Sequence, residues 1–199
     1  MSVPQYLLVI VSAYLIGSFS TGITLSRLQG RDIRREGSRS SGATNVTRVL
    51  GLGYGLLTFL GDFLKAALAV LLGRLIGGMP GMLAAGLFAV IGHNWPVYYK
   101  FKGGKGVVCS IAVLLLTFPV PALIAGGAAI LSIVLTRYVS VGSLIFVGLS
   151  ALLILFTRGF LPYGLWALVL FALAAYQHRA NISRLLRGQE NKFEPGRKK

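Results

Sequence analysis

The sequence predicts an all-α integral membrane protein with seven transmembrane helices. Hydrophobic residues make up 55% of the chain, charged residues make up only 13%, and the mean hydropathy is +0.74. A soluble domain of 199 residues would carry more charge on its surface. The polar residues are clustered instead, and the apolar stretches between them approach the ~20 residues that a bilayer-spanning helix needs.

Apolar stretches alternate with turn signals or polar segments along the whole chain. They lie at about 6–25, 49–76, 82–98, 107–118, 122–136, 139–156 and 160–177. The sequence Gly-Gly-Met-Pro-Gly at 77–81 marks a turn between the second and third stretches. The fourth and fifth stretches are short for full spans, so a hairpin that enters the bilayer only partway is an alternative. Small residues four apart, such as Gly73, Gly77 and Gly81, favour close helix packing in lipid.

Basic residues predict the orientation. With the N-terminus outside, the inner side receives 17 of the 20 Lys and Arg residues, and the outer side receives only Arg74 and Arg158. The positive-inside rule therefore predicts an outside N-terminus and a cytosolic C-terminus. We expect a single membrane domain, 1–199. Its expected cytosolic segments are about 26–48, 99–106, 137–139 and the tail 178–199.

The net charge of +15 limits the choice of partner. The basic residues lie in short loops between apolar stretches, a pattern that favours anionic lipid headgroups and phosphorylated substrates over nucleic acid. Two histidines, one cysteine and scattered acids offer no recognisable metal site, so neither a metal nor a cofactor is expected.

The first segment that can carry chemistry is 37–48, which is small and rich in hydroxyl groups. Ser38, Thr44 and Asn45 supply hydrogen-bond donors, and Arg48 supplies a bidentate fork for phosphate. The N-terminus of the helix expected to follow Arg48 adds a positive dipole end. The alternative is a solvated linker that ends in a helix N-cap.

The second segment, 92–106, contains the sequence Gly-Gly-Lys-Gly. Lys102, Gly103, Gly104 and Lys105 are typical of an anion-binding loop, because glycines free backbone N–H groups and lysine adds a point charge. The loop is not a Walker A motif, since the positions that need Gly and Ser or Thr hold Tyr99 and Gly106. The alternative is a positive-inside loop with an aromatic belt. His93 is either a ligand of the substrate or a structural histidine.

The third segment begins at His178. On a helix, His178, Asn181 and Leu185 share one face, so an imidazole and an amide can point into one site on the inner side. The alternative is an amphipathic basic helix on anionic lipid. Ser143 lies near the inner start of the sixth stretch, where a helix N-terminus can face a phosphate.

Asp62 and Lys65 lie in the middle of an apolar stretch. Their i, i+3 spacing predicts an ion pair that fixes helix packing. A functional role is the alternative, because ionisable groups in lipid are expensive and commonly serve a purpose.

Together these segments resemble the bacterial acyl-phosphate:glycerol-3-phosphate acyltransferase family. The matching motifs are Gly-Ala-Thr-Asn-Val-x-Arg at 42–48, Gly-His-x-x-Pro…Phe-Lys-Gly-Gly-Lys-Gly at 92–106, and His-Arg-x-Asn-Ile-x-Arg-Leu-Leu-x-Gly at 178–188. Arg39 and Ser40 replace the glycine and asparagine that the family usually carries before the first motif. The His-x4-Asp arrangement of other acyltransferases is absent, since Tyr98 and Ser183 stand five positions after the two histidines.

The resemblance implies transfer of a fatty acyl group from acyl phosphate to glycerol 3-phosphate. The products are lysophosphatidic acid and inorganic phosphate, in the first acylation step of phospholipid synthesis at the bacterial inner membrane, with the active site facing the cytosol. The implied catalytic residues are Lys105, His178 and Asn181. The implied substrate-binding residues are Ser38, Thr44, Asn45, Arg48, His93, Lys102, Gly103, Gly104 and Ser143.

The expected partners are glycerol 3-phosphate, acyl phosphate and membrane lipids, and the protein is expected to be a monomer. An organic-anion transporter is the main alternative function. It would need a polar path to the outer side, for which only Asp62 and Lys65 are candidates. A membrane scaffold that binds anionic lipid without catalysis is a further alternative.

Overall fold

The computed structural model describes residues 1–193, whose regular secondary structure is all helical and includes no strand. The all-α prediction is therefore confirmed. The chain divides into two compact units, one covering Met1–Thr117 and the other beginning at Phe118. Within the described part, five helical stretches are long and apolar enough to cross a membrane: Val3–Leu28, Leu52–Tyr99, Pro119–Thr136, Val139–Arg158 and Phe160–Gln177. The last residues of the predicted tail, 194–199, lie outside the described residues.

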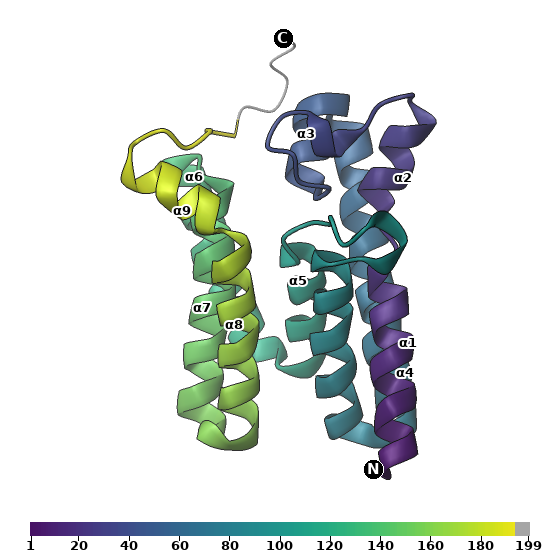
Figure 1. Ribbon diagram of the computed structural model, residues 1–199. Coiled ribbons are helices and arrows are strands. Elements are labelled where there is room, and N and C mark those ends of the chain that lie inside the picture. The colour runs from purple at the N-terminus through teal and green to yellow at the C-terminus, as the bar shows by residue number, and fades with distance from the viewer. Residues whose placement is uncertain (194–199) are drawn as a thin grey trace. The chain divides into compact units, whose positions relative to one another are not determined.

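The first unit is built around one long, bent helix, α4. Both α1 and α5 pack against α4, while α2 and α3 lie at the end of the unit opposite the N-terminus (Figure 1). The elements of this unit are α1 (Val3–Ser18), α2 (Thr21–Leu28), η1 (Ile33–Arg35), α3 (Ala43–Leu50), α4 (Leu52–Asn94), η2 (Val97–Tyr99) and α5 (Val107–Thr117).

Two breaks interrupt the apolar stretches of this unit. The predicted first span is divided at Phe19, where the backbone is extended and α1 ends. Ser20 then caps α2, its hydroxyl accepting a hydrogen bond from the backbone N–H of Ile23. The turn predicted at 77–81 is confirmed as a bend within α4, where Gly77 and Gly78 have non-helical backbone angles and Gly78 has a φ of 58°.

The predicted start of the second span, at about 49, is wrong. Residues Ala43–Leu50 form a separate short helix, α3, which ends where Gly51 takes a φ of 95° and turns the chain into α4. This helix was not predicted because its polar side chains give it the composition of a loop. Arg48 therefore lies in the last turn of α3, and the expected helix N-terminus directly after it does not exist as predicted.

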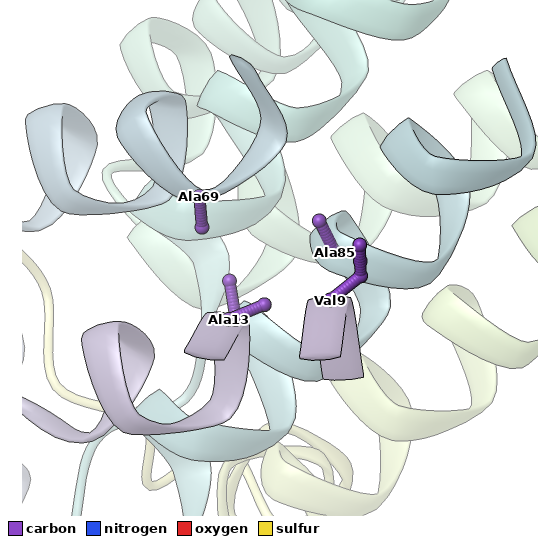
Figure 2. Packing of buried hydrophobic residues seen from close by; sticks show 5 residues of the cluster. Val9, Ala13, Ala69 and Ala85 are labelled. Atoms are coloured by element: carbon purple, nitrogen blue, oxygen red, sulfur yellow. The ribbon is translucent and has the colours of Figure 1, made fainter. Parts of the chain in front are cut away.

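Small residues let α1 and the two halves of α4 approach closely. Val9 and Ala13 of α1 form a buried cluster with Ala69, Ala85 and Ala89 of α4, of which four are labelled in Figure 2. The Cα atoms of Gly73 and Gly81 face each other across the bend, since a Cβ on either would collide with the other's carbonyl oxygen. The packing interpretation is confirmed for Gly73 and Gly81, whereas Gly77 forms part of the bend.

The second unit contains three apolar helices and a short terminal one. They are α6 (Pro119–Thr136), α7 (Val139–Arg158), α8 (Leu165–Gln177) and α9 (Arg179–Leu186), with the irregular turn η3 (Phe160–Gly164) before α8. Helix α7 packs against both α6 and α8. Helix α6 begins earlier than predicted and, with 18 residues, is long enough to span, whereas α5 has 11 residues and a length of about 16 Å.

Replacing Gly73 with alanine should destabilise the protein. The new Cβ would press against the Gly81 carbonyl oxygen and the Ala85 Cβ, and overpacking of this kind costs about 1–3 kcal/mol. The midpoint of thermal unfolding in detergent measures the effect. Gly127→Ala in α6 is the control, because a Cβ there meets nothing within 4 Å. Equal midpoints for the two variants would show that the close approach at Gly73 contributes no stability.

Candidate active site

The buried side chain of Asn45 holds the loop at residues 36–40 in the first polar segment. Its Oδ1 accepts a hydrogen bond of 2.8 Å from the Ser38 N–H. Its Nδ2 donates to the carbonyl oxygens of Ser40 at 2.9 Å and Glu36 at 3.0 Å. A Cβ on Gly37 would collide with the same amide, so glycine at 37 lets the loop close over it. The amide predicted to bind substrate therefore holds the loop in shape.

Three other predicted groups remain available at the surface of this segment. Thr44 and Arg48 are four residues apart on α3, so they share a face. Arg48 is exposed, while Ser38 and Thr44 are half-buried. Within residues 1–193, none of these three side chains forms a hydrogen bond or an ion pair with another residue. Two hydroxyls and a guanidinium can thus meet an anionic oxygen here.

Two arginines between α2 and α3, Arg34 and Arg31, have internal partners. Arg34 forms two hydrogen bonds of 2.9 Å with Asp32, which lower the pKa of that carboxyl to about 2. Arg31 pairs with Glu36 and donates to the Val49 carbonyl oxygen at 3.1 Å. These contacts fix the chain between α2 and α3, which leaves Arg48 as the guanidinium on α3 that is open to a ligand.

Tyr99 joins the first two predicted segments. Its ring belongs to a buried cluster with Ile23, Ile33 and Val46, and its carbonyl oxygen accepts a hydrogen bond of 3.3 Å from Arg34. Its hydroxyl lies 3.2 Å from that of Thr24. The glycine-lysine loop (residues 103–106) follows Tyr99 closely, so it is attached to the α2–α3 segment within one unit.

The glycine-lysine loop, residues 103–106, folds against the end of α4. The Gly104 N–H donates to the His93 carbonyl oxygen at 3.1 Å. A Cβ on Gly103 would collide with that carbonyl oxygen, and a Cβ on Gly104 would collide with the His93 ring at Nε2. Two of the glycines thus serve close packing, which leaves the exposed Lys102 and the half-buried Lys105 on either side of the contact.

A buried polar cluster lies beneath this loop, and it confirms the predicted Asp62–Lys65 ion pair. Lys65 Nζ is 3.0 Å from Asp62 Oδ1, and Asp62 has no exposed surface. The same Nζ is 3.0 Å from His93 Nδ1 and donates to the Phe19 carbonyl oxygen. His93 therefore has a structural partner on α4 as well as a face toward Gly104.

His178 forms the junction of α8 and α9 in the second unit. Its side chain is buried, and its Nδ1 lies 2.8 Å from the Ala174 carbonyl oxygen. A carbonyl can only accept, so Nδ1 carries the hydrogen, and the neutral ring has its acceptor at Nε2. That tautomer suits a group that takes up a proton.

Glu190, which the sequence analysis missed, gathers the side chains around Asn181. Its Oε1 accepts hydrogen bonds from Asn181 at 2.6 Å and Ser140 at 3.0 Å, and its Oε2 accepts one from Arg184 at 2.8 Å. Burial raises the pKa of Glu190, but these hydrogen bonds outweigh it and hold that pKa below its ordinary value. The carboxylate fixes the orientation of the Asn181 amide. The sequence offered only a weak indication of this role, because Glu190 is a single acidic residue in a basic tail.

Ser143 is also buried, and its hydroxyl donates to the Val139 carbonyl oxygen of its own helix at 2.7 Å. Ser140, one turn earlier on α7, binds Glu190. The first turn of α7 is therefore linked through Ser140 to the segment that follows α9. Ser143 can present its oxygen to a ligand only as an acceptor while its hydrogen bond to Val139 is kept.

Comparisons with known proteins identify the family. The sequence profile of the family described as glycerol-3-phosphate acyltransferase matches residues 7–188. The chain is 45% identical to the glycerol-3-phosphate acyltransferase of Halalkalibacterium halodurans, over 96% of each chain, and 43% identical to that of Clostridioides difficile, over 100% of each. The chain belongs to the glycerol-3-phosphate acyltransferase family.

Solved structures agree with this assignment. The chain resembles the crystal structure of PlsY (YgiH), an integral membrane glycerol 3-phosphate acyltransferase, in its glycerol 3-phosphate form. The TM-score is 0.88 at 39% identity, over 95% of this chain and 96% of that one. For the lysophosphatidic acid form of PlsY the TM-score is 0.85 at 38% identity, over 95% of each chain. The prediction of a membrane acyltransferase of phospholipid synthesis is confirmed.

Replacing Glu190 with glutamine should destabilise this acyltransferase in a pH-dependent way. The variant loses the charge that Arg184 and Asn181 bind, and charged hydrogen bonds of this kind contribute about 1.5–3 kcal/mol each. Because the pKa of Glu190 is lowered in the folded protein, the ionised carboxylate stabilises the fold at pH values above the ordinary glutamate pKa. This stabilisation is lost as the pH falls. The gap in unfolding midpoint between the wild type and Glu190→Gln should therefore be largest at pH 7 and shrink below about pH 4.5.

The exposed neighbour Gln189 provides the control, because Gln189→Ala removes a side chain without touching the Glu190 contacts. A gap that stays constant between pH 7 and pH 4 would contradict the role given to the Glu190 charge.

Proposed function

We propose that this acyltransferase moves a fatty acyl group from acyl phosphate to glycerol 3-phosphate, giving lysophosphatidic acid and inorganic phosphate. The observation that supports this most strongly is the family match over residues 7–188, which includes all three polar motifs. The relative PlsY has been solved in a glycerol 3-phosphate form and in a lysophosphatidic acid form, which are the acceptor and the product of this reaction.

The proposed reaction is a direct attack within a ternary complex. A hydroxyl oxygen of glycerol 3-phosphate attacks the acyl carbonyl carbon, an ester C–O bond forms, and the bond from that carbon to the phosphate oxygen breaks. The hydroxyl proton passes to a phosphate oxygen or to His178. Acyl phosphate is already activated, so the reaction needs no serine or cysteine nucleophile. The oxyanion that develops needs donors, and losing one such donor costs on the order of 10²–10³ in rate.

The proposed catalytic residues are Lys105, His178 and Asn181. Both substrates are anions, so Arg48, Lys102 and Lys105 would bind and neutralise phosphate, with Ser38 and Thr44 adding donors. Because its amide holds the 36–40 loop, Asn45 would act by positioning this loop. His93, Gly103, Gly104 and Ser143 complete the proposed binding set.

The proposed topology has seven spans, with the N-terminus outside and the C-terminus in the cytosol. The stretch Leu52–Tyr99 is bent at Gly77 and Gly78, so it can cross the membrane twice. With α5 counted as a short span, seven crossings place the basic loops on the inner side, as the positive-inside rule requires. We propose that residues 1–199 act as one membrane domain, as a monomer, in a bacterial inner membrane with the active site facing the cytosol.

Purified protein supplied with acyl phosphate and glycerol 3-phosphate should release phosphate and form lysophosphatidic acid. Lys105→Ala should lower turnover by at least 10²-fold, because an oxyanion or phosphate contact is lost. Lys100→Ala, an exposed lysine just before the loop, is the matched control and should keep activity. No phosphate release by the wild type would refute the proposed activity. Near-normal turnover by Lys105→Ala would refute the catalytic role of Lys105.

Arg48→Gln should raise the KM for glycerol 3-phosphate or for acyl phosphate by about tenfold or more, since a bidentate phosphate contact contributes about 1.5–3 kcal/mol. Arg35→Gln removes the same charge from an exposed arginine between α2 and α3 and should leave both KM values unchanged. Initial rates over a range of each substrate provide the measurement. Equal KM values for the two variants would show that general charge, and not the face of α3, binds the substrate.

A further inference from the structure

The buried cluster of Asp62, Lys65 and His93 determines where the hydrogen of His93 lies. Three atoms surround the Lys65 ammonium: the Phe19 carbonyl oxygen, Asp62 Oδ1 at 3.0 Å and His93 Nδ1 at 3.0 Å. The first two can only accept hydrogen bonds. An ammonium has three hydrogens to donate and no acceptor, so Nδ1 can hydrogen-bond to it only as the acceptor, while Asp62 Oδ1 meets it as an ion pair.

A charged imidazole is incompatible with these contacts, since Asp62 Oδ1, which lies 3.8 Å from His93 Nδ1, already balances the charge of Lys65 at 3.0 Å. If His93 were protonated on both nitrogens, an N–H of a cation would point at the Lys65 ammonium from 3.0 Å. Because Asp62 and Lys65 are both buried, they balance each other's charge, and a second cation would be uncompensated. His93 is therefore neutral, with a bare Nδ1 and its single hydrogen on Nε2.

The hydrogen on Nε2 faces the glycine-lysine loop. A Cβ on Gly104 would collide with Nε2, so this nitrogen lies directly against the Gly104 backbone. The loop is itself held to His93 by the hydrogen bond from the Gly104 N–H to the His93 carbonyl oxygen. The imidazole and the loop thus keep a fixed relation to each other.

We infer that Lys65, charge-balanced by Asp62, is a positioning residue that holds His93 as its Nε2–H tautomer, so that a neutral hydrogen-bond donor is presented beside Gly104. The acceptor of this Nε2–H hydrogen bond is an anionic oxygen of a substrate, either a phosphate oxygen or the oxyanion of the acyl carbonyl. This role rests on the proposed function, because the substrate supplies the oxygen. The tautomer itself does not depend on the reaction.

The tautomer can be measured directly. The chain has only two histidines, so ¹⁵N-histidine labelling gives two imidazole rings, and the His178→Gln variant identifies the signals of His93. In the wild type at pH 7, Nδ1 should resonate as an unprotonated nitrogen and Nε2 as a protonated one. A protonated Nδ1, in either a neutral or a charged ring, would overturn the inference.

Activity tests the positioning role. Asp62→Leu with Lys65→Met removes the ion pair as a whole, which avoids leaving one buried charge unpaired. This variant should show mixed His93 tautomers, and kcat/KM for glycerol 3-phosphate should fall on the order of 10- to 100-fold per folded protein. Asp62→Leu with Lys65→Gln keeps an amide donor for Nδ1 and should recover part of the activity and of the Nε2–H signal.

Thr58→Ala provides the control, since Thr58 is buried on α4 one turn before Asp62 and, among residues 1–193, its hydroxyl bonds only to Tyr54 of its own helix. It should change neither the spectrum nor the rate. Wild-type activity in the folded Asp62→Leu, Lys65→Met variant, or equal losses in the two double variants, would overturn the positioning role. If the double variants do not fold, the wild-type spectrum decides. An inactive wild type with the expected spectrum would refute the proposed function alone.

Discussion

One buried ammonium group connects the parts of the first unit. A backbone carbonyl at a helix break needs a partner within the protein where packing shields it from water. Lys65 supplies this partner for Phe19, where α1 ends, and binds Asp62 and His93 as well. It thereby ties the end of α1 to both halves of α4. Close contacts at glycines, such as Gly61 against Thr21 and Gly92 against Tyr14, bring the helices near enough for this.

Each polar segment contains one buried side chain that organises it. Asn45 shapes the loop before α3, His93 supports the glycine-lysine loop, and Glu190 orients the Asn181 amide. The groups suited to meet a substrate, such as Arg48, lie on the surface that these side chains support. The motifs that identify the family therefore combine two kinds of residue, and only one of them needs to touch a phosphate.

The sequence predicted the contacts that are local and missed those that join distant residues. The Asp62–Lys65 pair follows from i, i+3 spacing, but the contact of Lys65 with His93 links residues 28 positions apart and depends on the bend in α4. Glu190 binds Ser140, 50 positions away in the sequence, and no periodicity in the sequence predicts this contact. Helix α3 was missed because a short polar helix has the composition of a loop. The apolar helices and the bend at Gly77 were predictable, since length, hydropathy and glycine mark them directly.

The contact between Gly104 and the His93 ring changes how loss-of-function alleles in the glycine-lysine loop should be interpreted. An alanine at 104 would push the imidazole away from its place before any substrate arrives. A genetic screen would score such an allele together with true ligand-binding defects, although the lesion lies in the support of the loop. Intolerance of substitution at this glycine therefore reports the shape of the unliganded protein as much as its affinity for an anion.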